Sequence, residues 1–307
     1  MNPTPAEHFP PPDWRRCAPP AAVPRAPVLY EFPGSLACRQ VKLALAEKGL
    51  DWRGRLVNRL TLGHLAPDYL GLNPRGEVPT LVDGDCVVYD TVAILRYVDE
   101  RLPGPPLTPA DPAARRRMDQ WLEVQRRLPL PELELALAGG WRGHFWRHRL
   151  RREAVALNRR LRRHAGLADH FQSRLDEVLR LLSTLQSRGE IRRQVDTCAA
   201  VLTRLESTLA AHPFAAGEDF SLADAAFGPV LERMAALRMD RLWRDGRLPR
   251  VADYLERLRA RPAFARVLAG DDTPARRVRV WLPYLSPRVA VAIIVLLAAG
   301  LSLQVLL

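Results

Sequence analysis

The chain has 307 residues, of which 46 are basic and 34 acidic, so its formal net charge is +12. This length is enough for two small domains with a sizeable core, and only two of the basic residues are lysine, an arginine bias that we attribute to a GC-rich genome. The four cysteines, Cys17, Cys38, Cys86 and Cys198, are scattered and form no Cys-x-x-Cys pair, which argues against a disulfide framework or a zinc site and suits a reducing compartment.

The N-terminal half alternates predicted strands and helices behind a Pro-rich arm. Residues 1–26 lack the apolar segment of a cleavable signal, and we expect them to form a disordered arm. Apolar periodicity and turn residues then predict, in chain order, a strand at 28–32, a helix at 36–48 that ends at Gly49, a strand at 55–57, a short helix at 65–72, a hairpin around Asp83-Gly84 and a helix at 90–102.

A proline precedes the third predicted strand. Asn73-Pro74 and Gly76 punctuate a loop, and Val78-Pro79 leads into the apolar run Thr80-Leu81-Val82. A proline at this place removes a backbone donor and can hold a cis peptide in a tight turn. Such a turn leaves the N–H and C=O of Val78 available to another extended backbone, which predicts a peptide-binding device.

The second half carries two further patterns. Ser221 and Asp224 are spaced as a capping box, in which each residue satisfies a backbone group of the other at a helix start. Two helical stretches follow, at 254–258 and 261–268. Together with the strand–helix order and the Val78-Pro79 turn, these patterns resemble the glutathione transferases over residues 27–270.

The resemblance implies the fold class and the domains. Residues 27–104 are expected to form an α/β thioredoxin-like domain that binds glutathione, and residues 105–270 an all-α domain. In that family, bound glutathione is the co-substrate, and the protein lowers the pKa of its thiol so that the thiolate attacks a hydrophobic electrophile. The family also dimerises, so a homodimer is a possible assembly.

By its position before the first helix, Ser35 resembles the catalytic serine of the zeta and theta classes. Its hydroxyl can donate to the thiolate, and the helix N-terminus adds positive potential. A simple N-cap serine is the alternative, and one residue can fill both roles. Cys38 completes a Ser-x-x-Cys sequence, which leaves a redox role open beside that of a buried structural thiol.

The resemblance also implies the residues that bind glutathione. Val78, held by Pro79, is expected to pair with the cysteinyl backbone, and Asp90 and Thr91 to bind the γ-glutamyl end, where the family usually has Glu-Ser or Gln-Ser. His64 is expected either to reach the glycyl carboxylate or to be a surface-loop histidine.

A basic insertion spans residues 141–193, where 14 arginines face five acidic residues. Its arginines alternate with leucines and alanines at helical spacing over 147–163, and 175–185 predicts a second helix. Three interpretations stay open: a solvated arginine face, attraction to anionic lipid, and nucleic-acid binding, for which no recognised fold is present. His144 and His148 lie four residues apart without a carboxylate partner, so we expect no metal site.

The last 19 residues, 289–307, carry no charge and follow a basic linker at 271–288. As a helix they would span about 28 Å, close to the ~30 Å hydrocarbon core of a bilayer. This predicts a single C-terminal transmembrane helix, with the soluble part facing the cytoplasm because basic and aromatic residues flank that side. A buried core helix is the alternative.

The insertion and the tail resemble the tail-anchored, ganglioside-induced differentiation-associated branch of the family. The function expected from these features is a membrane-anchored transferase that conjugates glutathione to hydrophobic electrophiles or reduces them with it. The alternative is a non-catalytic membrane adaptor or redox sensor. The expected partners are glutathione, the electrophile and the bilayer, and no nucleic acid.

Overall fold

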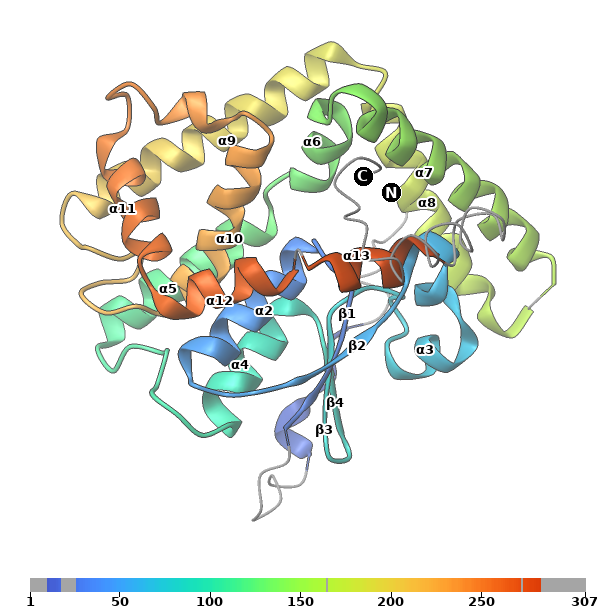
Figure 1. The fold of residues 1–307 in the computed structure, drawn as a ribbon, viewed down its shortest axis with the longest axis horizontal. Coiled ribbons are helices and arrows are strands. Elements are labelled where there is room, and N and C mark those ends of the chain that lie inside the picture. Colours follow the sequence, from blue (N-terminus) through green and yellow to red (C-terminus); the bar gives the residue numbers. More distant parts are fainter. Residues whose placement is uncertain (1–9, 18–25, 164, 272, 283–307) are drawn as a thin grey trace, which may run out of the picture.

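A four-stranded mixed sheet forms the centre of the N-terminal half (Figure 1). The computed structural model describes residues 10–17, 26–163, 165–271 and 273–282. The strand order is β2-β1-β3-β4; β1 is parallel to β2 and antiparallel to β3, and β3 is antiparallel to β4. The elements of this half are β1 Val28–Glu31, α2 Leu36–Glu47, β2 Arg53–Leu56, α3 Pro67–Leu72, β3 Thr80–Asp83, β4 Cys86–Tyr89 and α4 Thr91–Arg101.

This order of elements is the thioredoxin-like arrangement that the sequence predicts, and the boundaries differ by no more than two residues. The second strand begins at Arg53 instead of residue 55. Its residues Arg53-Gly54-Arg55 are exposed and give no apolar alternation. Backbone pairing with β1, from Val28 opposite Arg53 onward, defines this strand where hydrophobicity does not.

In the C-terminal half, the described residues form helices and no strand. Its longer helices are α5 Pro112–Arg126, α6 Leu130–Leu137, α7 Gly140–Leu161, α8 Ala168–Thr184, α9 Arg188–Leu209, α10 Leu222–Ala236, α11 Pro249–Arg259, α12 Pro262–Asp271 and α13 Pro274–Trp281. Helix α10 is buried along almost its whole length and begins at the predicted capping box. There Asp224 accepts hydrogen bonds from the backbone N–H of Ser221 at 2.8 Å and from the hydroxyl of Tyr254 at 2.6 Å, and the box prediction is confirmed.

One continuous hydrophobic core joins the two halves, with α2 packed against α10 and α12. Buried polar contacts fix this packing. The amide of Gln40 donates to Gln125 at 2.8 Å and to the carbonyl of Ala226 at 2.7 Å. Arg261 donates to both carboxylate oxygens of Glu47 at 2.7 Å. Helix α2, which starts at the expected active-site serine, is therefore held from two sides.

Helices α7 and α8 form the hairpin predicted for the insertion, and Figure 1 shows them side by side next to α3. Leu150 and Leu157 of α7 pack with Phe171 and Val178 of α8 and with Leu70 of α3. The hairpin thus lies against the thioredoxin-like half as well as against the helical half.

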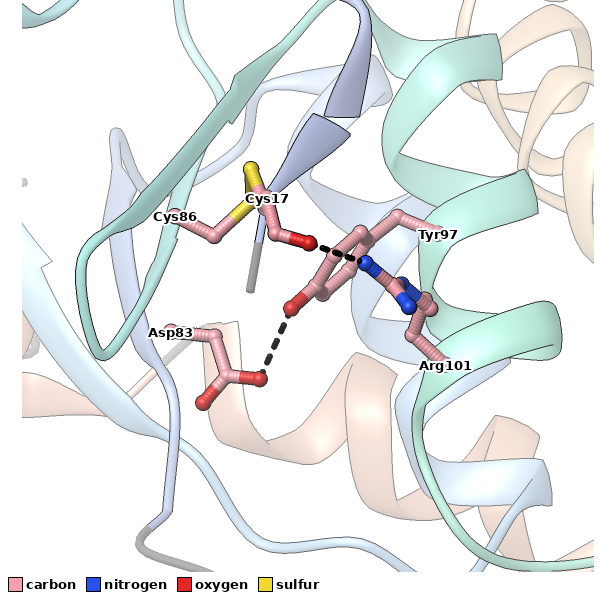
Figure 2. The surroundings of a disulfide bond; sticks show 5 residues. All are labelled: Cys17, Asp83, Cys86, Tyr97 and Arg101. Atoms are coloured by element: carbon pink, nitrogen blue, oxygen red, sulfur yellow. Dashed lines mark hydrogen bonds between the residues drawn. A yellow bond between two sulfur atoms is a disulfide. The ribbon is translucent and has the colours of Figure 1, made fainter. Parts of the chain in front are cut away.

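The N-terminal arm corrects two predictions. Residues 10–17 are ordered, with a short 3₁₀ helix η1 at Trp14–Arg16, because Trp14 is buried edge-on against Tyr97 with ring centroids 5.6 Å apart. A disulfide joins Cys17 to Cys86 in β4, and Arg101 donates to the Cys17 carbonyl at 2.7 Å (Figure 2). The expectation that the cysteines are unpaired was wrong for this pair, since their spacing of 69 residues conceals their proximity.

The C-terminal end of the described chain is α13, which crosses from α12 toward α7 in Figure 1. The amide of Asn58 donates to the Val280 carbonyl at 2.8 Å, and Trp281 packs on Phe145 with ring centroids 5.0 Å apart. Within the residues that the structure describes, no helix is long and apolar enough to cross a membrane. The tail at 289–307 lies outside those residues.

Candidate functional site

The turn before β3 has a cis peptide bond between Val78 and Pro79, as the sequence suggests. Val78 lies just outside the ladder, which begins at Thr80. In the described part of the chain, neither the N–H nor the C=O of Val78 has a hydrogen-bond partner. The turn therefore presents one donor and one acceptor to an extended backbone laid alongside it.

Two side chains fix the loop that leads into this turn. The amide of Asn73 donates to the Glu77 carbonyl at 2.9 Å and to the Thr80 hydroxyl at 3.0 Å. The hydroxyl of Tyr69 donates to the same Glu77 carbonyl and lies 2.9 Å from the Thr80 hydroxyl. These contacts bracket Val78 on both sides, so the turn is preorganised for a ligand.

Ser35 is the N-cap of α2, and its hydroxyl oxygen accepts from the backbone N–H of Cys38 at 3.4 Å. Accepting this bond leaves the hydroxyl hydrogen available for donation. The N-cap interpretation is therefore correct and leaves the donor role open. Arg233 of α10 donates to the carbonyl of Gly34 and forms an ion pair with Glu134 at 3.0 Å, which fixes the loop beside Ser35.

Cys38 is fully buried one turn into α2. Burial raises the pKa of its thiol to about 11, an effect that the Ser35 hydroxyl only partly offsets. The thiol is thus protonated at neutral pH, which favours the structural role over the redox role.

Asp90 caps α4 in a left-handed conformation, with φ of 76°. One carboxylate oxygen accepts from the N–H groups of Val92 at 3.1 Å and Ala93 at 3.2 Å. The other accepts from the buried guanidinium of Arg75 at 2.9 Å. Thr91 follows as the first residue of α4, so its backbone N–H belongs to the helix N-terminus. Arg75, which sequence reasoning missed, orients the acid of this pair.

His64 is fully buried in the 3₁₀ helix η3 at Gly63–Leu65, so the surface-loop interpretation was wrong. Its Nε2 lies 3.2 Å from Glu153 of α7. Burial lowers the pKa of His64 to about 4, with a partial offset from Glu153, so the imidazole is neutral at pH 7. A neutral, enclosed imidazole offers no positive charge to a glycyl carboxylate, and the predicted contact with glutathione gains no support here.

Glu153 is the centre of this buried group. It accepts from Arg149 at 2.8 Å and from Arg174 at 3.0 Å. Although burial opposes its ionisation, Arg174 and the other partners hold the pKa of Glu153 well below its usual range. The signal in the sequence was the placement of Glu153, the only acid of α7, between Leu150 and Leu157 on the apolar side of the helix.

An apolar cluster adjoins the Val78-Pro79 turn. Phe32, Cys38 and Val78 form it together with Val280, and Phe145, Trp146 and Trp281 pack against it. Phe145 and Trp146 therefore contact the thioredoxin-like half. No group of three or more metal-ligating side chains occurs among the described residues.

The comparisons with known proteins decide the family. The chain is 30% identical over 248 residues to glutathione S-transferase 3 of Zea mays, covering 80% of this chain and 95% of that protein. The chain belongs to the glutathione S-transferase family. The family's N-terminal domain model matches residues 29–106 and its C-terminal domain model residues 145–257.

Two further similarities cover the same span. The glutathione S-transferase TCHQD of Arabidopsis thaliana is 28% identical, with 83% of this chain and 95% of that protein covered. The solved structure of glutathione S-transferase III in apo form has 28% identity and a TM-score of 0.59 over 81% of this chain and 99% of its own. The thioredoxin-like and helical halves are thus the two domains of the transferase fold.

Proposed function

We propose that this protein is a glutathione transferase that activates the thiol of bound glutathione at Ser35. The Val78-Pro79 turn carries the proposal, because the N–H and C=O of Val78, which have no partner among the described residues, fit the cysteinyl backbone of glutathione in a two-bond antiparallel ladder. Ser35 at the start of α2 provides a hydroxyl donor and a helix N-terminus for the sulfur.

The chemistry follows from these groups. The thiol loses its proton to solvent, and the Ser35 hydroxyl with the N-terminus of α2 stabilises the sulfur anion. The thiolate then forms a bond to an electrophilic carbon of the second substrate. In a substitution the electron pair leaves with a group such as chloride; in an addition to an activated alkene the resulting carbanion takes a proton from water.

Asp90 and Thr91 are the proposed binders of the γ-glutamyl end. The hydroxyl and N–H of Thr91 suit its carboxylate, and Asp90 suits its amino group. Because Arg75 neutralises part of the Asp90 charge, we expect weaker binding of the amino group than an unpaired acid would give. The electrophile is proposed to be hydrophobic, since Phe32, Phe145 and Trp146 belong to or pack on the apolar cluster beside the turn.

Replacing Ser35 tests the proposal. Full-length protein in mild detergent should conjugate glutathione to a chlorinated aromatic electrophile, and Ser35→Ala should lower kcat/KM by about a hundredfold, as expected for loss of one donor to a developing anion. Ser187→Ala is the matched control, because Ser187 caps α9 through the same bond to a backbone N–H at 3.2 Å but lies elsewhere. Unchanged turnover in Ser35→Ala would refute the assignment.

We also propose that residues 289–307 anchor the protein in a membrane. The support is the uncharged length of the tail and the basic residues Arg276 and Arg277 that precede it. We expect the protein to stay in the membrane fraction after carbonate extraction. The double substitution Leu296→Arg and Leu297→Arg should abolish this retention.

The orientation proposed from the basic flank places the soluble part in the cytoplasm. The Cys17–Cys86 disulfide is instead typical of an oxidising compartment. Protease protection of the soluble part in sealed vesicles distinguishes the two sides: cleavage from the cytoplasmic face is the expected result, and protection from it contradicts the orientation.

A non-catalytic adaptor or sensor is the second candidate. The observation that favours it is Val280, which is buried in the same apolar cluster as Val78. This function predicts that glutathione binds with no conjugation or reduction of any electrophile tested.

A further inference from the structure

The outer face of α7 carries positive charge that the fold does not use. The exposed residues among those that the structure describes fall within about 140° around the helix axis. They are Gly140, His144, His148, Arg151, Arg152, Val155, Asn158, Arg159 and, just past the helix end, Arg162 and Arg163. This set, the arginine face, contains no acidic residue.

None of the five arginine side chains of this face has an ion-pair or hydrogen-bond partner within the described ranges of the chain. Three other arginines of α7 behave differently: Arg147 donates to the Leu135 carbonyl at 3.0 Å, Arg149 binds Glu153, and Arg160 donates to the Leu65 carbonyl at 2.9 Å. Because the inward arginines are used in packing and the outward ones are not, the arginine face is available for an external anion.

The shape and place of this face fit a flat anionic surface. A 22-residue helix is about 33 Å long and presents its charges in one line. Val155 stands in the middle of the line with 54% of its surface exposed, an apolar side chain that suits the headgroup region of a bilayer better than an aqueous polyanion. Trp281, eight residues before the uncharged tail begins, packs on Phe145 near the start of the same helix.

We propose that the arginine face docks on anionic lipid headgroups and orients the transferase on the membrane surface. The docking is peripheral, because the apolar side of α7 is already packed against α8 and α3. Each arginine near such a surface strengthens membrane association about fivefold, and salt screens the effect. The inference rests on the membrane placement proposed above and is independent of the chemistry at Ser35.

A probe at position 155 tests the docking. The native cysteines do not compete for label, since Cys38 and Cys198 are buried and the other two form a disulfide. Full-length Val155→Cys protein carrying a fluorophore is reconstituted in phosphatidylcholine vesicles with or without phosphatidylserine, and quenching by headgroup-labelled lipid is measured. Strong quenching is expected only with phosphatidylserine, and it should disappear at about 0.5 M salt.

Two controls make the result specific. A probe at Thr203→Cys, exposed on α9, should stay unquenched. Changing Arg151, Arg152, Arg159 and Arg162 to Gln should abolish quenching at position 155. The same change at Arg116, Arg238, Arg241 and Arg247, which are also exposed, should leave it intact although net charge falls equally.

Quenching that ignores lipid charge or survives the four substitutions overturns the proposal, as does tight RNA binding by this face in place of lipid binding. If the tail does not anchor the protein, the protein is lost from the membrane fraction on carbonate extraction, which is a separate readout. In that case, salt-sensitive flotation of the protein with phosphatidylserine vesicles still supports lipid docking by the arginine face. Absence of such flotation overturns the docking proposal.

Discussion

Burial keeps the side chain of His64 neutral, and its partner is Glu153 of the inserted hairpin. Its Nε2–H donates to Glu153, and its Nδ1 has no partner among the described residues, as expected for a neutral imidazole. Protonation would place a second hydrogen, and a charge, in an enclosed space where Arg149 and Arg174 already neutralise the acid. The contact between the thioredoxin-like domain and the hairpin is therefore sensitive to pH.

Stability should fall as pH is lowered through the ordinary pKa of histidine. The unfolded chain takes up a proton near pH 6.5, whereas burial lowers the pKa of folded His64 to about 4, so the unfolded state binds more protons between these values. Between pH 7 and pH 5 this costs about 2 kcal/mol of unfolding free energy. Urea unfolding should show that loss in the wild type and in His148→Gln, an exposed control, but not in His64→Gln.

A His64→Gln variant that keeps the full loss of stability would show that other groups cause it.

The roles of individual residues were only partly predictable from the sequence. Ser35 was readable because it immediately precedes an amphipathic helix, whereas the burial of His64 depends on Glu153, 89 residues away.

Elements that follow from local sequence patterns are as predicted, whereas those that depend on contacts between distant residues are not. The cis turn at Val78-Pro79 and the box at Ser221 follow from a few adjacent residues. The ordered structure of residues 10–17 instead depends on the ring contact of Trp14 with Tyr97 and on the disulfide between Cys17 and Cys86. Neither contact can be recognised from a periodic pattern in the sequence.

Reducing the disulfide tests how η1 is held. The bond closes a loop over a separation of 69 residues, for which the chain-entropy model gives about 4 kcal/mol of stabilisation. A reductant should therefore lower the unfolding free energy of the wild type by roughly this amount. It should not change the unfolding free energy of Cys17→Ser, because that variant cannot form the disulfide. Equal stability of the oxidised and reduced wild type would show that Trp14 alone holds the segment.

At the scale of the whole molecule, the transferase fold brings separate segments to one place. The start of α2, the turn before β3 and the start of α4 come from the thioredoxin-like domain, and α7 with α13 adds aromatic groups beside them. The sequence predicted the first three as walls of one site. It did not predict that Val280 and the hairpin pack in the same apolar cluster as Val78, because these residues are far apart in the sequence.

A structure of the full-length protein with glutathione tests the central claim most directly. The account predicts the tripeptide antiparallel to Val78, with its sulfur within hydrogen-bond distance of the Ser35 hydroxyl and its γ-glutamyl carboxylate at Thr91. Glutathione bound elsewhere, or with its sulfur away from Ser35, would contradict the account.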